Sequence, residues 1–296
     1  MTNNKLRRSY SGMRLWQKMV FSTALLLCLS LFISYQNPIF DFDMSKILST
    51  TTTLFSILVG FFIASAMSNF LRLKTLISSE TGGLFSVYKF ADLIDENLGK
   101  EVKEAIDKYI IASFDWELEE YVEKTGKEFE NIFDVLKKRK MLPDNRKEDQ
   151  ALNFLMNDLG SLPSIRNEIS IVAKTTLNNL YWVLLIILAI LTIFAVLMGT
   201  QFTFISILLA VSISAAVLFA LFLLDEIDKN RLNESDIAFN NFNQLLISLG
   251  MLPYYLESDI KEGRIKVDGS KDYRLCRYKK APNSSEKEIL VIEAKN

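Results

Sequence analysis

The side chains with the clearest capacity for chemistry lie in an uncharged stretch at 48–71, where particular types recur at every fourth position. Thr53, Ile57, Phe61 and Ser65 follow this spacing, which places them on one face of a helix. Several copies of such a helix around an axis would stack a hydroxyl ring, two bulky apolar rings and a second hydroxyl ring. Neutral rings and apolar constrictions are able to select and gate ions. The spacing therefore predicts a pore-lining face.

A second stripe in the same stretch consists of small side chains. Ser56, Gly60, Ala64 and Ser68 are also four residues apart, and small residues allow another membrane helix to approach closely. We expect this stripe to pack against a helix. The periodicity leaves an alternative open for the first stripe, in which Ile57 and Phe61 face lipid or a neighbouring helix.

The composition argues against most enzyme classes. The chain has 296 residues, no His and two Cys, Cys28 and Cys276, so His-based acid–base catalysis and paired-Cys metal sites are absent. The sequence also lacks phosphate-binding and dinucleotide-binding glycine motifs. We predict no catalytic site, no metal and no cofactor. The net charge of −1 disfavours nucleic acid as a partner, and a membrane-bound enzyme is the least favoured alternative.

Four apolar stretches must position these stripes, and they are listed here by residue number: 20–35, 48–71, 180–200 and 202–224. A helix needs about 20 residues to cross a bilayer core about 30 Å thick. The first stretch is short and could be a signal peptide, but no small-residue cleavage site precedes Asp41. We therefore predict an all-α membrane protein with four transmembrane helices, a cytoplasmic helical domain and a small β-rich C-terminal tail.

The flanking charges indicate the orientation. Basic residues without acidic ones occupy the N-terminal tail, and Arg72, Lys74, Lys229 and Arg231 flank the even-numbered spans. Positive charge favours the cytoplasmic side, so both termini and the segment between spans two and three are expected there. The predicted division is a basic tail 1–18, spans one and two in 19–71, a helical domain 72–179, spans three and four in 180–224, a packing helix in 225–260 and a tail 261–296.

Two long helices are expected to join the spans to the helical domain. One starts at Ser161-Leu-Pro163, with Pro in the first turn, and continues unbroken into the third span. The other extends from the second span until Gly82-Gly83 loosens it. Short strands are expected near 264–267, 272–279 and 288–294.

Over residues 20–250 the sequence resembles the bestrophin-like family of bacterial membrane proteins. The resemblance rests on an acidic residue after the second span, a tyrosine–tryptophan pair, an arginine and tryptophan around the third span, and an acidic motif after the fourth. These residues are Glu80 with Leu84 and Tyr88, Tyr109 and Trp116, Arg166 and Trp182, and Leu223-Leu224-Asp225. The Pro expected after the last motif is absent, and Ile227 stands there.

This resemblance implies a homo-oligomeric, five-fold ion channel of the bacterial inner membrane, surrounded by lipid and passing small inorganic ions. Its neck positions correspond to Thr53, Ile57 and Phe61, and Val59-Gly60-Phe61 is similar to the family's glycine–aromatic step. Thr53 departs from the bulky pattern, and Asn69-Phe70 stands where a double tryptophan is expected. No calcium-binding loop is recognisable. The family suggests anions, whereas the acidic excess in 72–179 favours cations.

A function of a different class is also open. The chain could be a non-conducting membrane scaffold or signalling protein that recruits a cytoplasmic protein partner through residues 261–296. The sequence does not separate these two alternatives, because a packed helix and a conducting neck share the same periodicity.

Overall fold

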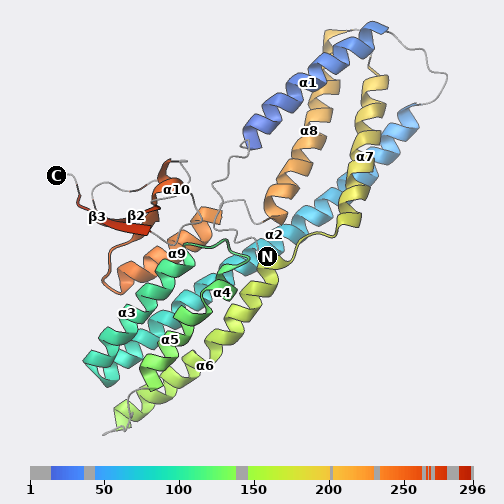
Figure 1. Cartoon of the computed structure of the whole chain (residues 1–296). Helices are drawn as coiled ribbons and strands as arrows, with labels where there is room; N and C mark the ends of the chain where they lie inside the picture. The colour runs from blue at the N-terminus through green and yellow to red at the C-terminus, as the bar shows by residue number, and fades with distance from the viewer. Residues whose placement is uncertain are drawn as a thin grey trace, which may run out of the picture. The chain divides into compact units, whose positions relative to one another are not determined.

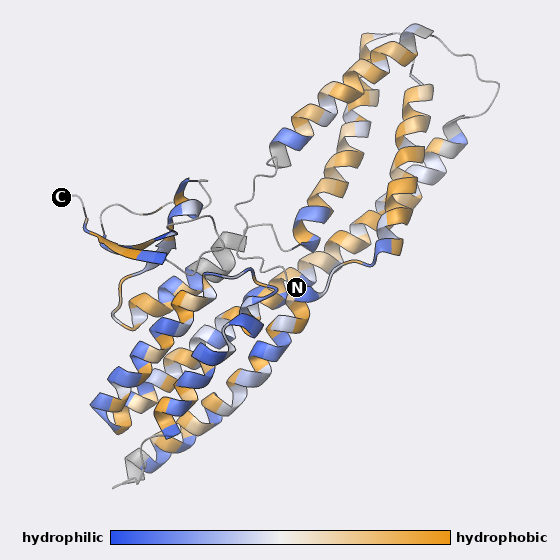
Figure 2. Ribbon diagram, viewed as in Figure 1, coloured by the Kyte–Doolittle hydropathy of each residue, from blue (hydrophilic) through white to orange (hydrophobic). Residues whose placement is uncertain are grey.

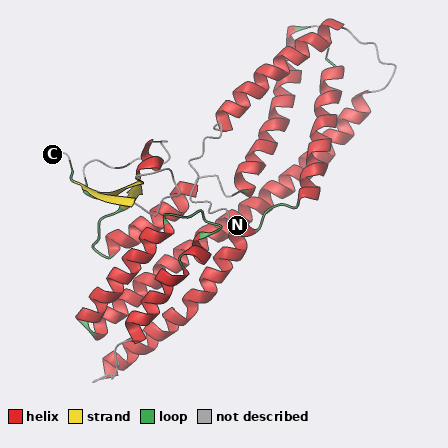
Figure 3. Cartoon of the chain, viewed as in Figure 1, coloured by secondary structure: helices red, strands yellow, loops and turns green. Residues whose placement is uncertain are grey.

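The computed structural model of the chain divides into two compact units (Figures 1 and 3). The apolar unit consists of Ser11–Phe70 and Thr176–Leu232, and the polar unit contains Leu71–Thr175 and Asn233–Asn296. The residues that the structure describes are 15–36, 44–137, 146–200, 203–229, 234–261, 265, 267, 271–278 and 287–294. The predicted acidic loop around Asp41 and most of the basic tail 1–18 lie outside them.

The apolar unit is built from four helices with few polar side chains (Figure 2). They are α1 (Leu15–Gln36), the first half of α2 (Met44–Ile94), α7 (Asn179–Met198) and α8 (Phe204–Asp228). Helix α1 packs on α7 and α8, and α7 packs on α8. The side chains of Asn178 and Thr203 accept backbone N–H groups at the starts of α7 and α8, which satisfies donors that a helix leaves free.

Three stretches in the described part of the chain are long and apolar enough to cross a membrane: one within Leu48–Ile94, one within Asp149–Met198 and Phe204–Asp228. In the second of these the apolar residues belong to α7. Helix α1 forms at the first predicted span, but its apolar part, Gln17–Ile33, is shorter than the other three.

The polar unit is mainly helical and carries most of the charged side chains (Figure 2). Its helices are the second half of α2, α3 (Glu96–Ser113), α4 (Tyr121–Lys124), α5 (Gly126–Lys137), α6 (Arg146–Lys174), α9 (Glu234–Ser248) and α10 (Glu257–Lys261). Apolar residues at helical spacing on α3, such as Val102, Ile106 and Tyr109, are fully buried. These residues give α3 an apolar face that packs in the core of the polar unit.

The predicted unbroken helix into the third span is wrong. Helix α6 ends at Lys174 and α7 begins at Asn179. The break is fixed by side chains, because Asp228 accepts the N–H of Leu177 at 2.7 Å and the Asn178 amide oxygen accepts the N–H of Leu180 at 3.0 Å. The predicted start at Ser161-Leu-Pro163 is also wrong. Pro163 lies inside α6 with its side chain exposed. A proline there removes one helix hydrogen bond, and the burial of neighbours such as Leu162 offsets this cost.

Helix α2 does continue beyond the second span, but Gly82-Gly83 does not loosen it. The helix runs unbroken from Met44 to Ile94. A Cβ at Gly83 would lie 2.9 Å from Cδ2 of Leu162, so the missing side chain allows α6 to pack closely against α2. The glycine serves helix packing here and does not interrupt the helix.

The C-terminal region forms one three-stranded sheet. The strands are β1 (Tyr254–Leu256), β2 (Tyr273–Tyr278) and β3 (Lys287–Ile292), in the order β1-β2-β3. Strand β2 pairs in parallel with β1 and antiparallel with β3, so that Cys276 lies between Leu256 and Ile289. The strands predicted near 272–279 and 288–294 are confirmed.

The first predicted strand is misplaced. Ile265 and Val267 lie outside any strand, and β1 falls instead inside the segment 225–260 that was assigned to a helix. Helix α9 ends before Gly250, whose φ of 69° is readily adopted only by glycine. Asn243 of α9 then bonds both backbone groups of Tyr254, at 2.7 and 3.1 Å. These bonds hold the chain extended at β1.

The sheet is joined to the helices of the polar unit by charged contacts. Both terminal nitrogens of Arg274 donate to the Asp107 carboxylate on α3, at 2.9 and 2.8 Å. The Arg274 side chain also donates to the Leu252 carbonyl. Asp115 accepts from Tyr278 and from Lys287, both at 2.6 Å. The tail is thus an integral part of the polar unit.

The Arg274 contact yields a testable prediction. Because lysine cannot form a two-pronged bond, R274K should weaken the attachment of the sheet by about 1.5–3 kcal/mol, the usual contribution of bonds to a charged group. Amides of β2 and β3 should then exchange with solvent at least about tenfold faster in hydrogen-exchange mass spectrometry.

R277K is the matched control, because Arg277 pairs with Glu257 but is half exposed, and exposed pairs contribute about 0–1 kcal/mol. Equal exchange rates in the two variants would contradict a special role for the Arg274–Asp107 contact.

Candidate functional site

Helix α2 has one buried face within the apolar unit. This face consists of large apolar residues and one alanine: Phe55, Val59, Phe62 and Ala66. The ring of Phe62 contacts that of Tyr181 on α7, with centroids 5.1 Å apart. These residues recur with helical periodicity, so they define which side of α2 packs inside its own chain.

The predicted pore-lining residues all lie away from that buried face. Thr53, Ile57, Phe61 and Ser65 are exposed on α2, and the side chains of Ile57 and Phe61 are 64% and 65% exposed. The Thr53 hydroxyl donates to the Ser49 carbonyl at 2.8 Å, which satisfies its proton within the helix. The chain alone therefore presents two large apolar side chains, flanked by hydroxyl groups, on an open helix face.

The predicted packing stripe is exposed as well. Ser56, Gly60, Ala64 and Ser68 have no burying partner among the described residues, and a Cβ at Gly60 would meet nothing within 4 Å. The two stripes are about 60° apart around the helix, because each residue advances about 100°. The close helix contact expected at this stripe is therefore not made by the described part of this chain. A contact with a helix of a second copy stays a prediction.

A second site, in the polar unit, is a buried cluster of ionisable side chains. Glu80 of α2 is fully buried. Its carboxylate accepts the hydroxyl groups of Tyr109 and Tyr121 at 2.5 and 2.8 Å, and the Arg166 Nε lies 3.8 Å from it. Arg166 further donates to the Val122 carbonyl at 2.7 Å. These contacts connect four helices at one point, namely α2, α3, α4 and α6.

Burial controls the protonation of this cluster. It raises the pKa of Glu80 above its usual range, although hydrogen bonds from Tyr109 and Tyr121 and the charge of Arg166 act in the opposite direction. Burial also raises the pKa of both tyrosines well above their ordinary value, and the Glu80 charge adds to this shift. The two phenols therefore stay neutral donors at ordinary pH.

The shift of Glu80 predicts how stability depends on pH. A carboxyl group with a raised folded-state pKa contributes stability below its ordinary pKa, and this contribution is lost as the pH rises through the folded-state pKa. The melting temperature of the wild-type chain, relative to that of E80Q, should therefore fall as the pH rises from about 4 upward. A wild-type advantage that instead grows with pH would show that the tyrosines and Arg166 outweigh burial.

Sequence reasoning found part of this cluster. Glu80, Tyr109 and Arg166 were singled out by resemblance, but Tyr121 was missed, because nothing in its local pattern separates it from an ordinary core tyrosine. Trp182, which the resemblance also singled out, lies outside this cluster, and its Nε1 donates to Asp228 at 3.4 Å. Among the described residues, no group of three or more His, Cys, Asp or Glu is placed to hold a metal.

The family of this chain follows from its similarity to known proteins. The sequence profile of the bestrophin-like domain matches residues 44–230. The chain belongs to the bestrophin-like family. That range contains both stripes of α2 and the whole Glu80 cluster, so both sites are part of the bestrophin-like domain. No curated protein matches the chain.

Solved structures with a similar fold include bacterial proteins. Two variants of a bacterial bestrophin homologue from Klebsiella pneumoniae match with TM-scores of 0.59 and 0.60, at 16% and 15% identity. They cover 81% and 79% of this chain and 100% of their own. A variant described only as a membrane protein matches at a TM-score of 0.63 and 15% identity, covering 79% of this chain and 99% of its own. At these identities the similarity shows a shared fold.

Proposed function

We propose that this bestrophin-like chain assembles into a five-fold ion channel in the bacterial inner membrane, with both termini and the polar unit in the cytoplasm. Its pore would be lined by Thr53, Ile57, Phe61 and Ser65 of α2. Ions would pass passively and lose part of their hydration at the Ile57 and Phe61 rings, where dewetting closes the path.

The observation that carries this proposal is the open, uncharged face of α2. Ile57 and Phe61 are largely exposed, while the opposite face of the helix is buried within its own chain. Around a symmetry axis, the bulky stripe would face the centre and the small stripe at Ser56 and Gly60 would lie toward a neighbouring copy. This arrangement accounts for the small stripe, since small residues let helices approach closely. Membership of the bestrophin-like family supports the same assembly.

Ion flux from liposomes tests the proposal. The full-length chain is reconstituted into vesicles with separate potassium and chloride gradients, and dye-reported flux is measured for each ion. The proposal expects flux above that of protein-free vesicles, and the comparison of the potassium flux with the chloride flux gives the sign of the ion. An assembled oligomer that passes neither ion would contradict the proposal and favour the scaffold alternative.

A further inference from the structure

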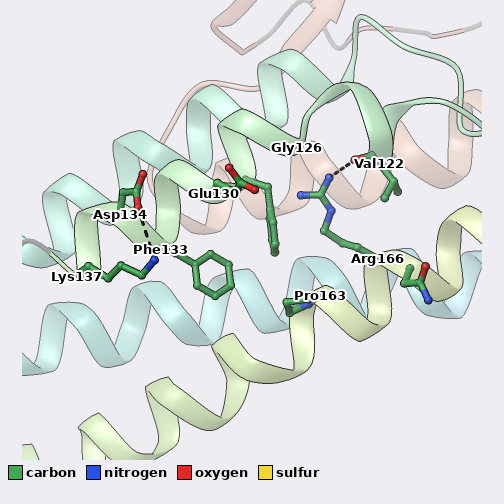
Figure 4. A pocket seen from close by; sticks show the side chains of 10 residues that line it. Val122, Gly126, Glu130, Phe133, Asp134, Lys137, Pro163 and Arg166 are labelled. Atoms are coloured by element: carbon green, nitrogen blue, oxygen red, sulfur yellow. Dashed lines mark hydrogen bonds and ion pairs between the residues drawn. The ribbon is translucent and has the colours of Figure 1, made fainter.

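The polar unit contains a pocket that the proposed conduction path does not use. It has a volume of about 690 Å³, which lies within the range of small-molecule sites. Residues of α4, α5 and α6 line it (Figure 4). Gly126, Glu130, Phe133 and Lys137 come from α5, while Pro163 and Arg166 come from α6.

The inner end of this pocket carries a cation with an unused donor. Arg166 is only 4% exposed, and its Nη2 donates to Val122 and to the Thr125 hydroxyl. Its Nη1 has no hydrogen-bond partner among the described residues. A buried, charged donor without an acceptor is costly, and an anionic oxygen would satisfy it.

The other residues that line the pocket restrict the kind of anion that it can bind. Phe129 lies against the guanidinium, with Cζ 3.9 Å from the ring centroid, and Phe133 extends the apolar wall. Glu130 and Asp134 are exposed residues of the lining, and their charges would repel a multiply charged anion. Among the described lining residues, Lys137 is the one basic group besides Arg166, and its Nζ lies 3.9 Å from the Asp134 carboxylate.

We propose that this pocket binds a small monocarboxylate with an apolar body. The carboxylate would meet Nη1 of Arg166, and the apolar body would lie along Phe129 and Phe133. Because Nη1 is closed to solvent in the free chain, binding requires a side chain that packs against the guanidinium to move, and Phe129 is the lining residue in that position. The proposal concerns a binding site and is independent of conduction.

Two glycines allow a matched test that leaves Arg166 untouched. Gly126 lines the pocket, and a Cβ built on it meets nothing within 4 Å, so G126L is expected to extend a bulky side chain into the pocket. Gly160 on α6 has equally free space but lies outside the pocket lining. G160L is therefore the control, and equal melting temperatures of both variants and wild type verify folding.

The probe is 4-fluorophenylacetate, added to the full-length chain in lipid nanodiscs and followed by fluorine NMR line broadening. Wild type and G160L are expected to broaden the signal equally at concentrations up to about 10 mM, and G126L to bind at least about tenfold more weakly. The neutral analogue 2-(4-fluorophenyl)ethanol should show no difference between wild type and G126L, and inorganic phosphate should not displace the probe.

Three results would overturn the proposal. Equal broadening by G126L and wild type would place the binding elsewhere or show that there is none. A neutral analogue that depends on Gly126 as strongly as the carboxylate would remove the role of Arg166. Displacement by inorganic phosphate would show a site for simple anions.

Discussion

F61A should raise ion flux through reconstituted vesicles by at least about tenfold, which corresponds to a barrier lower by about 1.4 kcal/mol. Phe61 is 65% exposed on α2, so its ring is free to narrow a shared pore. Removing one benzyl group from each copy widens the constriction and weakens dewetting there. Stopped-flow fluorescence of dye-loaded vesicles measures the change.

F32A is the control for this experiment. Phe32 lies on α1 of the same unit and is 64% exposed, so both substitutions remove the same group from an open face. Only the Phe61 variant should change the flux. A correctly assembled F61A oligomer with wild-type flux would count against a pore at this face, as would an equal increase in F32A.

R166M should lower the free energy of unfolding by about 3–5 kcal/mol, the usual effect of removing one partner from a buried ion pair. The variant keeps an apolar stem against Phe129 but loses the bond to Val122 and leaves Glu80 buried without a nearby cation. The pKa of Glu80 then rises further, so the loss of stability should grow with pH. Denaturant unfolding at several pH values measures both effects.

Two further variants make this prediction specific. R72M removes an ion pair between α2 and α6, Arg72 with Glu168, that is largely exposed, and should cost no more than about 1 kcal/mol. E80Q added to R166M should recover part of the loss, because it removes the uncompensated carboxylate. Equal effects of R166M and R72M, or no recovery in the double variant, would contradict the role assigned to the cluster.

Helix positions were predictable where local chemistry decides them. The apolar stretches form helices, and Gly250 ends α9, because these outcomes depend on composition and on one backbone angle. The local pattern around Asn178 did not settle the break before α7, since the break also depends on Asp228, which is 51 residues from Leu177 along the chain. Gly83 was misjudged for the same reason, because its role is set by Leu162 of another helix.

In the candidate sites, too, the sequence predicted what depends on local spacing and missed what depends on distant residues. Periodicity placed Thr53, Ile57, Phe61 and Ser65 on one face of α2, and the structure places all of them on its exposed side. Periodicity does not say what that side faces, because lipid and a second copy impose similar patterns. The pairing of Tyr121 with Glu80 joins residues 41 positions apart, and a single sequence carries no signal for such a contact.

Electron cryomicroscopy of the full-length chain in lipid nanodiscs gives the most direct test. We expect particles with five-fold symmetry in which five α2 helices surround an open axis, with the side chains of Thr53, Ile57 and Phe61 turned toward it. A single copy, or an assembly whose axis is filled by another segment while Ile57 and Phe61 face lipid, would contradict the proposed channel.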